Sequence, residues 1–230
     1  MKTLYIQFKN EIEQKELPLF RGAVISTMQD ANVLFHNHDK DRLRYSYPLI
    51  QYKRISKKAA MVCIEEGTEA IGEFFSNCNF DLQLGNKEMK LEIESVKAGQ
   101  TLVQIWNEEF TYRIHRWLPF NHVNYQQYQQ LDSLADKYAM LEKILIGNIL
   151  SFLKGIHLYV DKRITCNIVD IDEPYLTNYK GVKLMAYNAI FKCNISFPNY
   201  IGLGKGVSLG NGIVTMKHKE QEEKQNKTEQ

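Results

Sequence analysis

The order in which strand and helix patterns succeed one another constrains the fold of this chain more than any other feature. Within residues 1–97, period-two alternation and helical spacing follow each other in the order β-α-β-β-α-β. Strands are expected at residues 4–8, 47–55, 59–64 and 91–96, and helices at residues 17–28 and 67–78. This order is the signature of a ferredoxin-like domain.

The second half of the chain has a similar mixture of elements. Strands are expected at residues 101–105, 110–118, 164–169, 184–195 and 213–216, and one long helix at about 125–154. The predicted buried stripe of that helix comprises Leu131, Leu134, Tyr138, Leu141, Leu145 and Ile149. We therefore predict an α+β fold with domains at residues 1–97 and 98–217. Residues 218–230, rich in Lys, Glu and Gln, are expected to form a disordered tail.

Glycine is concentrated near the end of the chain, in Ile201-Gly-Leu-Gly-Lys-Gly-Val-Ser-Leu-Gly-Asn-Gly-Ile-Val214. Glycine loses more conformational freedom on folding than any other residue, so this density needs a structural reason. With Lys205 in its middle and a strand pattern at its end, the segment suggests a backbone cradle for phosphate. The alternative is a glycine-rich hairpin or bulge near a sheet edge.

This glycine segment matches neither of the common nucleotide-binding motifs. A triphosphate loop requires Gly-Lys followed by Ser or Thr and then a helix, whereas Gly206 follows Lys205 and no helix pattern follows. The dinucleotide fingerprint requires its third glycine at positions that Val207 or Leu209 occupies. We therefore expect no nucleotide cofactor.

Charge is unevenly distributed, although the net charge is only +2. Seven basic residues lie between residues 40 and 58 against the single acid Asp41: Lys40, Arg42, Arg44, Lys53, Arg54, Lys57 and Lys58. The tyrosines at 45, 47 and 52 are interleaved with them. The pattern fits either a solvated strand edge or a basic, aromatic surface that binds phosphates and bases.

The cysteines and the ends of the chain indicate its cellular setting. The 4 cysteines form no Cys-x-x-Cys pair and no zinc spacing, so we expect small buried hydrophobes in a reducing compartment. The first residues contain no apolar run typical of a signal peptide, and no stretch approaches a membrane-spanning length. We expect a cytoplasmic protein without a membrane partner.

Two histidines lie between the first helix and the second strand, in Phe35-His-Asn-His-Asp39. In a strand, His-x-His projects both rings to one face, which could form part of a metal site. A metal needs at least a third ligand, and only Asp39 is adjacent in the sequence. We therefore expect no metal, and a metal-dependent hydrolase is the weaker alternative.

The chemistry that fits this loop is RNA cleavage without metal. The ribose 2′-OH attacks the adjacent phosphate, so one group must remove its proton and another must protonate the leaving 5′-oxygen. Imidazole suits both roles because its pKa lies near neutrality. Cations and N–H groups would stabilise the phosphorane, and His36, His38, Tyr45 and the neighbouring Lys and Arg residues supply the required groups.

The histidine loop, the strand Tyr47-Pro-Leu-Ile-Gln-Tyr-Lys53 and the glycine segment together resemble a known family. They are similar to the repeat-processing endoribonucleases of the CRISPR-associated (Cas) family's sixth type, b variant, of the RAMP superfamily. The resemblance extends to about residue 217. It implies tandem ferredoxin-like (RRM-like) domains and metal-independent cleavage of CRISPR repeat RNA, giving a 2′,3′-cyclic (or 3′) phosphate and a 5′-hydroxyl.

The resemblance also implies roles for individual residues. His36 and His38 match the catalytic histidine position, and Tyr45 is the nearest candidate for the assisting tyrosine, which in many members precedes the histidine. RNA contacts are expected from Arg42, Arg44, Lys53, Gly202, Gly204, Lys205, Gly206, Gly210 and Gly212. A homodimer and a CRISPR effector complex are the possible protein partners. The main alternative is a non-catalytic RNA-binding module of such a complex.

Overall fold

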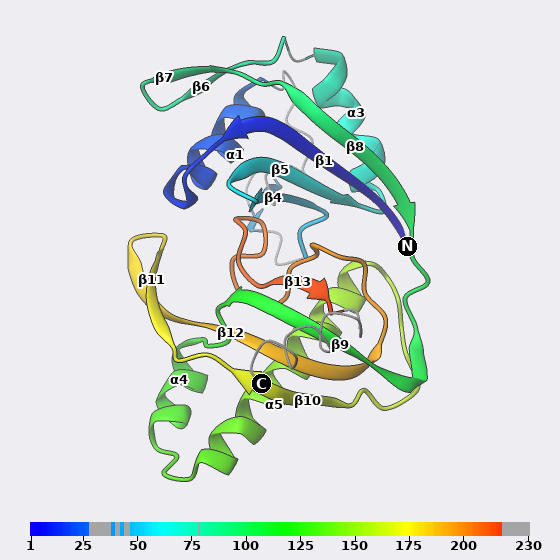
Figure 1. Ribbon diagram of the computed structural model, residues 1–230, viewed down its shortest axis with the longest axis vertical. Helices are drawn as coiled ribbons and strands as arrows, with labels where there is room; N and C mark the ends of the chain where they lie inside the picture. Colours follow the sequence, from blue (N-terminus) through cyan, green and yellow to red (C-terminus); the bar gives the residue numbers. More distant parts are fainter. Residues whose placement is uncertain (28–37, 40–41, 44–46, 78, 218–230) are drawn as a thin grey trace, which may run out of the picture. The chain divides into compact units, whose positions relative to one another are not determined.

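The computed structural model describes residues 1–27, 38–39, 42–43, 47–77 and 79–217 (Figure 1). Its contacts divide the chain into two compact units. Met1–Leu102, Ser151–Tyr159 and Gly206–Gly210 form the first unit, and Val103–Leu150, Val160–Lys205 and the residues from Asn211 onward form the second. The expected boundary between residues 97 and 98 lies close to Leu102, where the first segment of the first unit ends. Two later segments of the chain, which the sequence did not indicate, also pack with the first unit.

The first unit has the predicted β-α-β-β-α-β order. Its main elements are β1 (Lys2–Glu11), η1 (Gln14–Glu16), α1 (Leu17–Ser26), β4 (Ile50–Ile55), β5 (Lys58–Ile64), α3 (Gly67–Asn77) and β8 (Ile93–Gln100). The four strands pair antiparallel in the order β4-β5-β1-β8, so the first strand in sequence is central and the second lies at an edge. This arrangement confirms the ferredoxin-like prediction for the first unit.

One face of this sheet carries the apolar core of the first unit. Ile6 and Phe8 of β1 are completely buried, and they cluster with Phe20 of α1 and Phe74 of α3. The rings of Phe8 and Phe20 meet edge to face, with centroids 5.9 Å apart. The two helices therefore cover the same face of the sheet (Figure 1).

The second unit contains its own antiparallel sheet. Its elements are β9 (Ile105–Trp117), α4 (His122–Gln129), α5 (Leu134–Gly155), β10 (Cys166–Ile171), β11 (Tyr175–Tyr179), β12 (Val182–Ile195) and β13 (Ile213–Met216). The strand order is β10-β12-β9-β13, with β11 paired to β12. Counted along the chain, the four main strands have the same spatial order as in the first unit. The glycine segment stands where a ferredoxin-like domain has its second helix.

The single long helix predicted at residues 125–154 is wrong, because the structure contains two helices there. The Ser133 hydroxyl accepts a hydrogen bond from the Asp136 N–H at 3.4 Å, which caps a new helix after the break at residues 130–133. Leu141 and Ile149 are buried as predicted, but Leu134 is 69% exposed. The predicted stripe is therefore buried only from Leu141 onward, at Leu141, Leu145 and Ile149 of α5.

Two hairpins and one strand boundary also differ from the prediction. β6 (Asp81–Leu84) and β7 (Lys87–Lys90) form a hairpin, and β11 forms another with β12. Neither was predicted, although Gly85-Asn86 and Lys180-Gly181 occupy the turns. The predicted strand at 101–105 is also absent, since β9 begins only at Ile105. No helix of the described residues is long and apolar enough to cross a membrane.

Candidate functional site

The predicted histidine loop lies between α1 and β4. β2 (His38–Asp39) and β3 (Arg42–Leu43) pair antiparallel, with His38 opposite Leu43 and Asp39 opposite Arg42. The backbone therefore brings one predicted catalytic residue and one predicted RNA-binding residue into the same short ladder. His36, Arg44 and Tyr45 lie outside the described residues.

Lys53, predicted to contact RNA, is instead buried within the first unit. Its side chain is 0% exposed, and its ammonium donates to the Val207 carbonyl oxygen at 3.3 Å. Burial lowers the pKa of Lys53 from 10.5 to about 7, because desolvation disfavours the charged form. The Lys53 side chain is therefore packed inside the first unit and presents no accessible charge to which an RNA phosphate could bind.

The second part of the glycine segment covers the open edge of β4. The Tyr52 N–H donates to the Ser208 carbonyl oxygen at 3.0 Å, and Tyr52 forms a parallel bridge with Leu209. An edge strand otherwise presents unpaired backbone groups. Residues 206–210, which belong to the first unit, thus provide hydrogen-bond partners for the backbone of β4.

The glycines of this segment are required by the local backbone and by close packing. Gly212 has a φ of 64°, and a Cβ there would overlap the Leu203 carbonyl oxygen. Gly204 has a φ of 93°, and a Cβ there would lie 3.0 Å from the Trp117 ring. The expectation that this segment needs positive φ angles and close approach is confirmed at both positions.

Several N–H groups of the segment are already used within the protein. Those of Leu203, Lys205 and Gly212 donate to the carbonyl oxygens of Gly212, Leu118 and Arg116, respectively. They cannot serve in the phosphate cradle that the sequence suggested. Gly202, Gly210 and Gly212 are buried, whereas residues 204–206 and 208–209 are half-buried, so Lys205 is the one cation in the accessible part of the segment.

Lys205 lines a cleft of about 800 Å³ within the second unit. One wall is a stripe of α5 spaced by three and four residues: Asp136, Ala139, Met140, Lys143, Ile144, Gly147 and Asn148. The other wall comes from Pro119, Phe120, Asn121, Asn124, Gln127 and Leu131. The cleft combines two lysines, one carboxylate (Asp136), four side-chain amides and several apolar side chains, which is a lining suited to a polar ligand.

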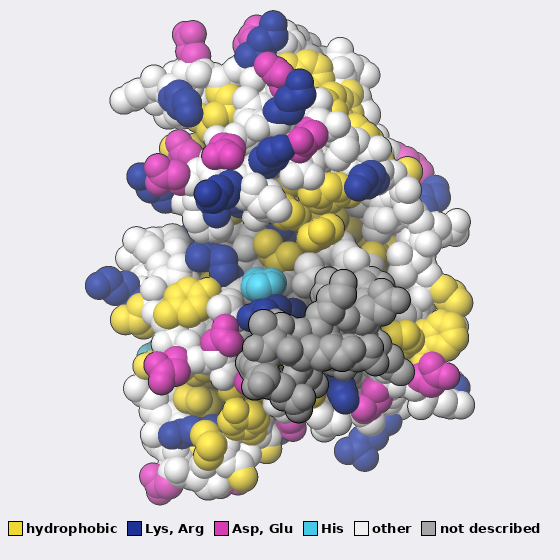
Figure 2. Space-filling model, viewed as in Figure 1, with side chains coloured by type: hydrophobic (Ala, Val, Ile, Leu, Met, Phe, Trp, Pro, Cys, Tyr) yellow, Lys and Arg dark blue, Asp and Glu magenta, His cyan; other side chains and the backbone are white. Residues whose placement is uncertain are grey.

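Cys63, Cys166 and Cys193 are buried free thiols, as expected, and Cys78 lies outside the described residues. No group of three or more His, Cys, Asp or Glu residues among those described could hold a metal ion. Basic side chains are interspersed with acidic ones on the face drawn in Figure 2. Neither sign of charge dominates this face, so attraction of RNA there would depend on local clusters of basic side chains.

Comparisons with known proteins bear directly on the family. A family model described as the Cas6b N-terminal domain matches residues 1–101, and one described as the Cas6b C-terminal domain matches residues 104–217. The chain belongs to the Cas6b family. The resemblance inferred from the histidine loop and the glycine segment is thereby confirmed.

Individual relatives agree with this assignment. An uncharacterized protein of Methanocaldococcus jannaschii, MJ0978, is 32% identical over 142 residues, covering 58% of this chain and 95% of the relative. A crystal structure of Cas6b has a TM-score of 0.83 at 22% identity, covering 94% of this chain and 100% of that one. A CRISPR RNA processing endoribonuclease, also Cas6b, has a TM-score of 0.72 at 20% identity with the same coverage. These structural similarities establish the shared fold.

Proposed function

We propose that this Cas6b-family protein is a metal-independent endoribonuclease that cleaves CRISPR precursor RNA within its repeats. The observation that carries the proposal is the match of both halves of the chain to Cas6b domain models. The His36-Asn-His38 motif after α1 supplies two imidazoles in a chain of that family. A structural neighbour with a TM-score of 0.72 is described as a CRISPR RNA processing endoribonuclease.

In the proposed reaction the 2′-OH of one nucleotide attacks the adjacent phosphate. His36 and His38 serve as the general acid and base, one removing the 2′-OH proton and the other protonating the leaving 5′-oxygen. Tyr45 orients the nucleophile, while Arg42 and Arg44 neutralise the phosphate charge that grows in the transition state. The products are a 2′,3′-cyclic phosphate and a 5′-hydroxyl.

The proposed RNA-binding surface has a second part at the glycine segment. Lys205 contacts the RNA backbone from the cleft between α4 and α5, where Lys143 supplies a further cation. The buried glycines of the segment contribute through the backbone shape that they permit. A relative described as a RAMP protein binding different RNA substrates shares the fold, with a TM-score of 0.57 at 13% identity. A homodimer and an effector complex are further proposals that follow from family membership.

The proposal is tested by incubating the protein with its cognate repeat RNA in EDTA and analysing the products on a denaturing gel. We expect cleavage at one position within the repeat by the wild type and none by a His36→Ala/His38→Ala double variant. Cleavage that requires an added divalent metal ion would contradict the proposed mechanism. Tight binding of repeat RNA by the wild type without any cleavage would favour the alternative, a binding module.

A further inference from the structure

Strand β9 contains a bulge that holds an arginine in an unusual conformation. Ile114 pairs with Ala189 and Trp117 pairs with Tyr187, so β9 carries one residue more than β12 between these two pairs. Within the bulge, Arg116 has a φ of 52°, in the left-handed region that non-glycine residues rarely adopt. Bulges of this kind redirect side chains and are common beside functional sites.

The bulge is fixed from two sides by specific hydrogen bonds. The Arg116 N–H donates to the Asn188 side-chain oxygen at 3.0 Å. The Arg116 carbonyl oxygen accepts from the Gly212 N–H at 3.0 Å, and Gly212 belongs to the glycine segment. The direction of the Arg116 side chain is therefore set by the surrounding structure.

Three groups that can carry positive charge lie close together on this strand. Arg113 and His115 are two residues apart, so they project to the same face of the sheet, and Arg116 follows in the bulge. One terminal nitrogen of Arg116 donates to the Thr177 hydroxyl at 3.0 Å. One terminal nitrogen of Arg113 lies 3.9 Å from an Asp172 carboxylate oxygen. These residues all belong to the second unit.

Both arginines have an unused donor. The Nε atoms of Arg113 and Arg116 are buried and have no hydrogen-bond partner among the described residues. Buried N–H donors almost always find an acceptor, and leaving one unpaired is costly, more so when it is charged. Because the two Nε atoms are themselves covered, a ligand from outside the protein would meet the terminal nitrogens instead, and the Arg113 side chain is 40% exposed.

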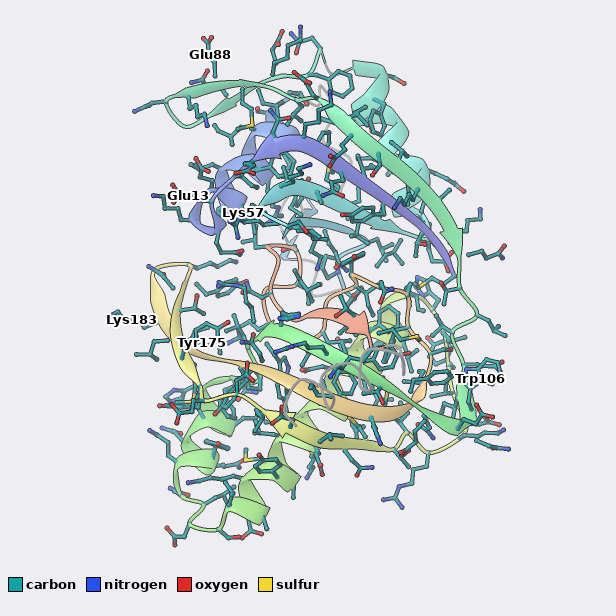
Figure 3. All side chains as sticks on the ribbon, in the orientation of Figure 1. Glu13, Lys57, Glu88, Trp106, Tyr175 and Lys183 are labelled. Carbon is teal, nitrogen blue, oxygen red and sulfur yellow. The ribbon has the colours of Figure 1, made fainter. Side chains whose placement is uncertain are left out.

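Burial and neighbouring charges both act on the titratable groups beside the two arginines. His115 has a lowered pKa because of its burial and of the nearby Arg113 guanidinium, and Asp172 opposes the shift only in part. Tyr175, at the start of β11 (Figure 3), is close enough to Arg116 and Asp172 for both charges to act on its pKa. Asp172 is also engaged by Asn188, whose amide nitrogen lies 3.1 Å from it. The Asp172 carboxylate is thus shared between the Arg113 guanidinium and the Asn188 amide.

We propose that Arg113 and Arg116 form a second anion site, which binds a backbone phosphate of the RNA through the accessible nitrogens of their guanidinium groups. This inference rests on the proposed function, since RNA is the anion that it names. Guanidinium groups are well suited to this role because their fixed donors match phosphate oxygens. The Tyr175 and Thr177 hydroxyls are additional polar groups at its border. The site would position the RNA and take no part in the chemical step.

The test compares Arg113→Gln and Arg116→Gln with Arg163→Gln, a matched control on the same unit, where the side chain is exposed. Affinity for repeat RNA is measured over a series of salt concentrations, and single-turnover cleavage is measured at saturating protein. We expect each cluster variant to lose roughly tenfold or more in affinity. The slope of log affinity against log salt concentration is negative, and it should become shallower by roughly 0.7–0.9 for each lost phosphate contact. Cleavage at saturation should match the control.

Arg113→Lys and Arg116→Lys guard against misfolding, because lysine keeps the charge but lacks the planar guanidinium with its fixed donors. They should retain most of the salt slope while losing part of the affinity. If the wild type neither binds nor cleaves repeat RNA, the proposed function fails and this inference fails with it. If the wild type does both, and all cluster variants match Arg163→Gln in affinity and salt slope, only this inference is overturned. A variant that loses cleavage at saturation with unchanged affinity also overturns it.

Discussion

Replacing Lys53 by Met removes a buried amine whose protonation opposes folding. The Lys53 side chain is fully buried, and burial lowers its pKa from 10.5 to about 7. Between these two values the unfolded chain holds a proton that the folded chain lacks. The free energy of unfolding of the wild type therefore rises with pH across this window, by about 1.4 kcal/mol per pH unit. The full difference of 3.5 pH units corresponds to about 5 kcal/mol.

The Lys53→Met variant also loses the hydrogen bond to the Val207 carbonyl oxygen. An unpaired buried carbonyl costs about 1–3 kcal/mol. At pH 6, where the folded wild type carries the full penalty of a buried ammonium, the variant should be more stable by about 2–4 kcal/mol. At pH 10 most of the penalty is gone, so the variant should be less stable than the wild type by about 1 kcal/mol.

The assay is urea unfolding of both proteins at several pH values from 6 to 10, followed by circular dichroism. Lys97→Met is the control, since Lys97 is exposed on β8 of the same sheet. The stability difference between Lys53→Met and the wild type should change sign across this range, while that of the control stays near zero. A difference for Lys53→Met that does not vary with pH would refute a buried, neutral Lys53.

Three further outcomes follow from the proposed site and fold. His36→Ala or His38→Ala should lower single-turnover cleavage by roughly 10²–10⁴-fold with little change in RNA affinity, and equal losses of rate and affinity would make them binding residues. Lys205→Ala should reduce affinity more than rate. Gly147→Met places a side chain in open space at the cleft and should also weaken RNA binding, whereas the control Gly72→Met on α3 should not. Unchanged RNA affinity in both Lys205→Ala and Gly147→Met would show that the RNA does not pass through the cleft. Gly212→Ala should lower the free energy of unfolding by about 2–4 kcal/mol, and a neutral effect in urea unfolding would contradict the close approach of Leu203.

The fold of the first unit was predictable because its alternation and helical spacing are regular. Leu4, Ile6 and Phe8 alternate on a strand, and Phe20 and Val24 recur one helical turn apart. The long helix was mispredicted because an apolar period continues through the break that Ser133 creates. The hairpin at Lys180-Gly181 had a local signal in its glycine, because two-residue turns of this kind need positive φ angles, which are 52° at Lys180 and 81° at Gly181.

The candidate site was less predictable, because burial and pairing depend on contacts between distant residues. Lys53 resembles its exposed basic neighbours in sequence, yet residues 206–210 cover β4 and enclose its side chain. The role of Arg116 depends on Asn188 and Gly212, which are far away in the chain. The sequence marked the glycine segment as unusual, but only the structure indicates that it replaces a helix and fixes the β9 bulge.

The central claim is that the RNA supplies its own nucleophile, and one substrate change tests it most directly. Repeat RNA with a single 2′-deoxy substitution at the nucleotide before the cleaved bond is compared with unmodified RNA, in EDTA, for both binding and cleavage. We expect unchanged affinity and complete loss of cleavage, with a 2′,3′-cyclic phosphate and a 5′-hydroxyl on the unmodified products. Cleavage of the 2′-deoxy substrate at the same bond would contradict the account.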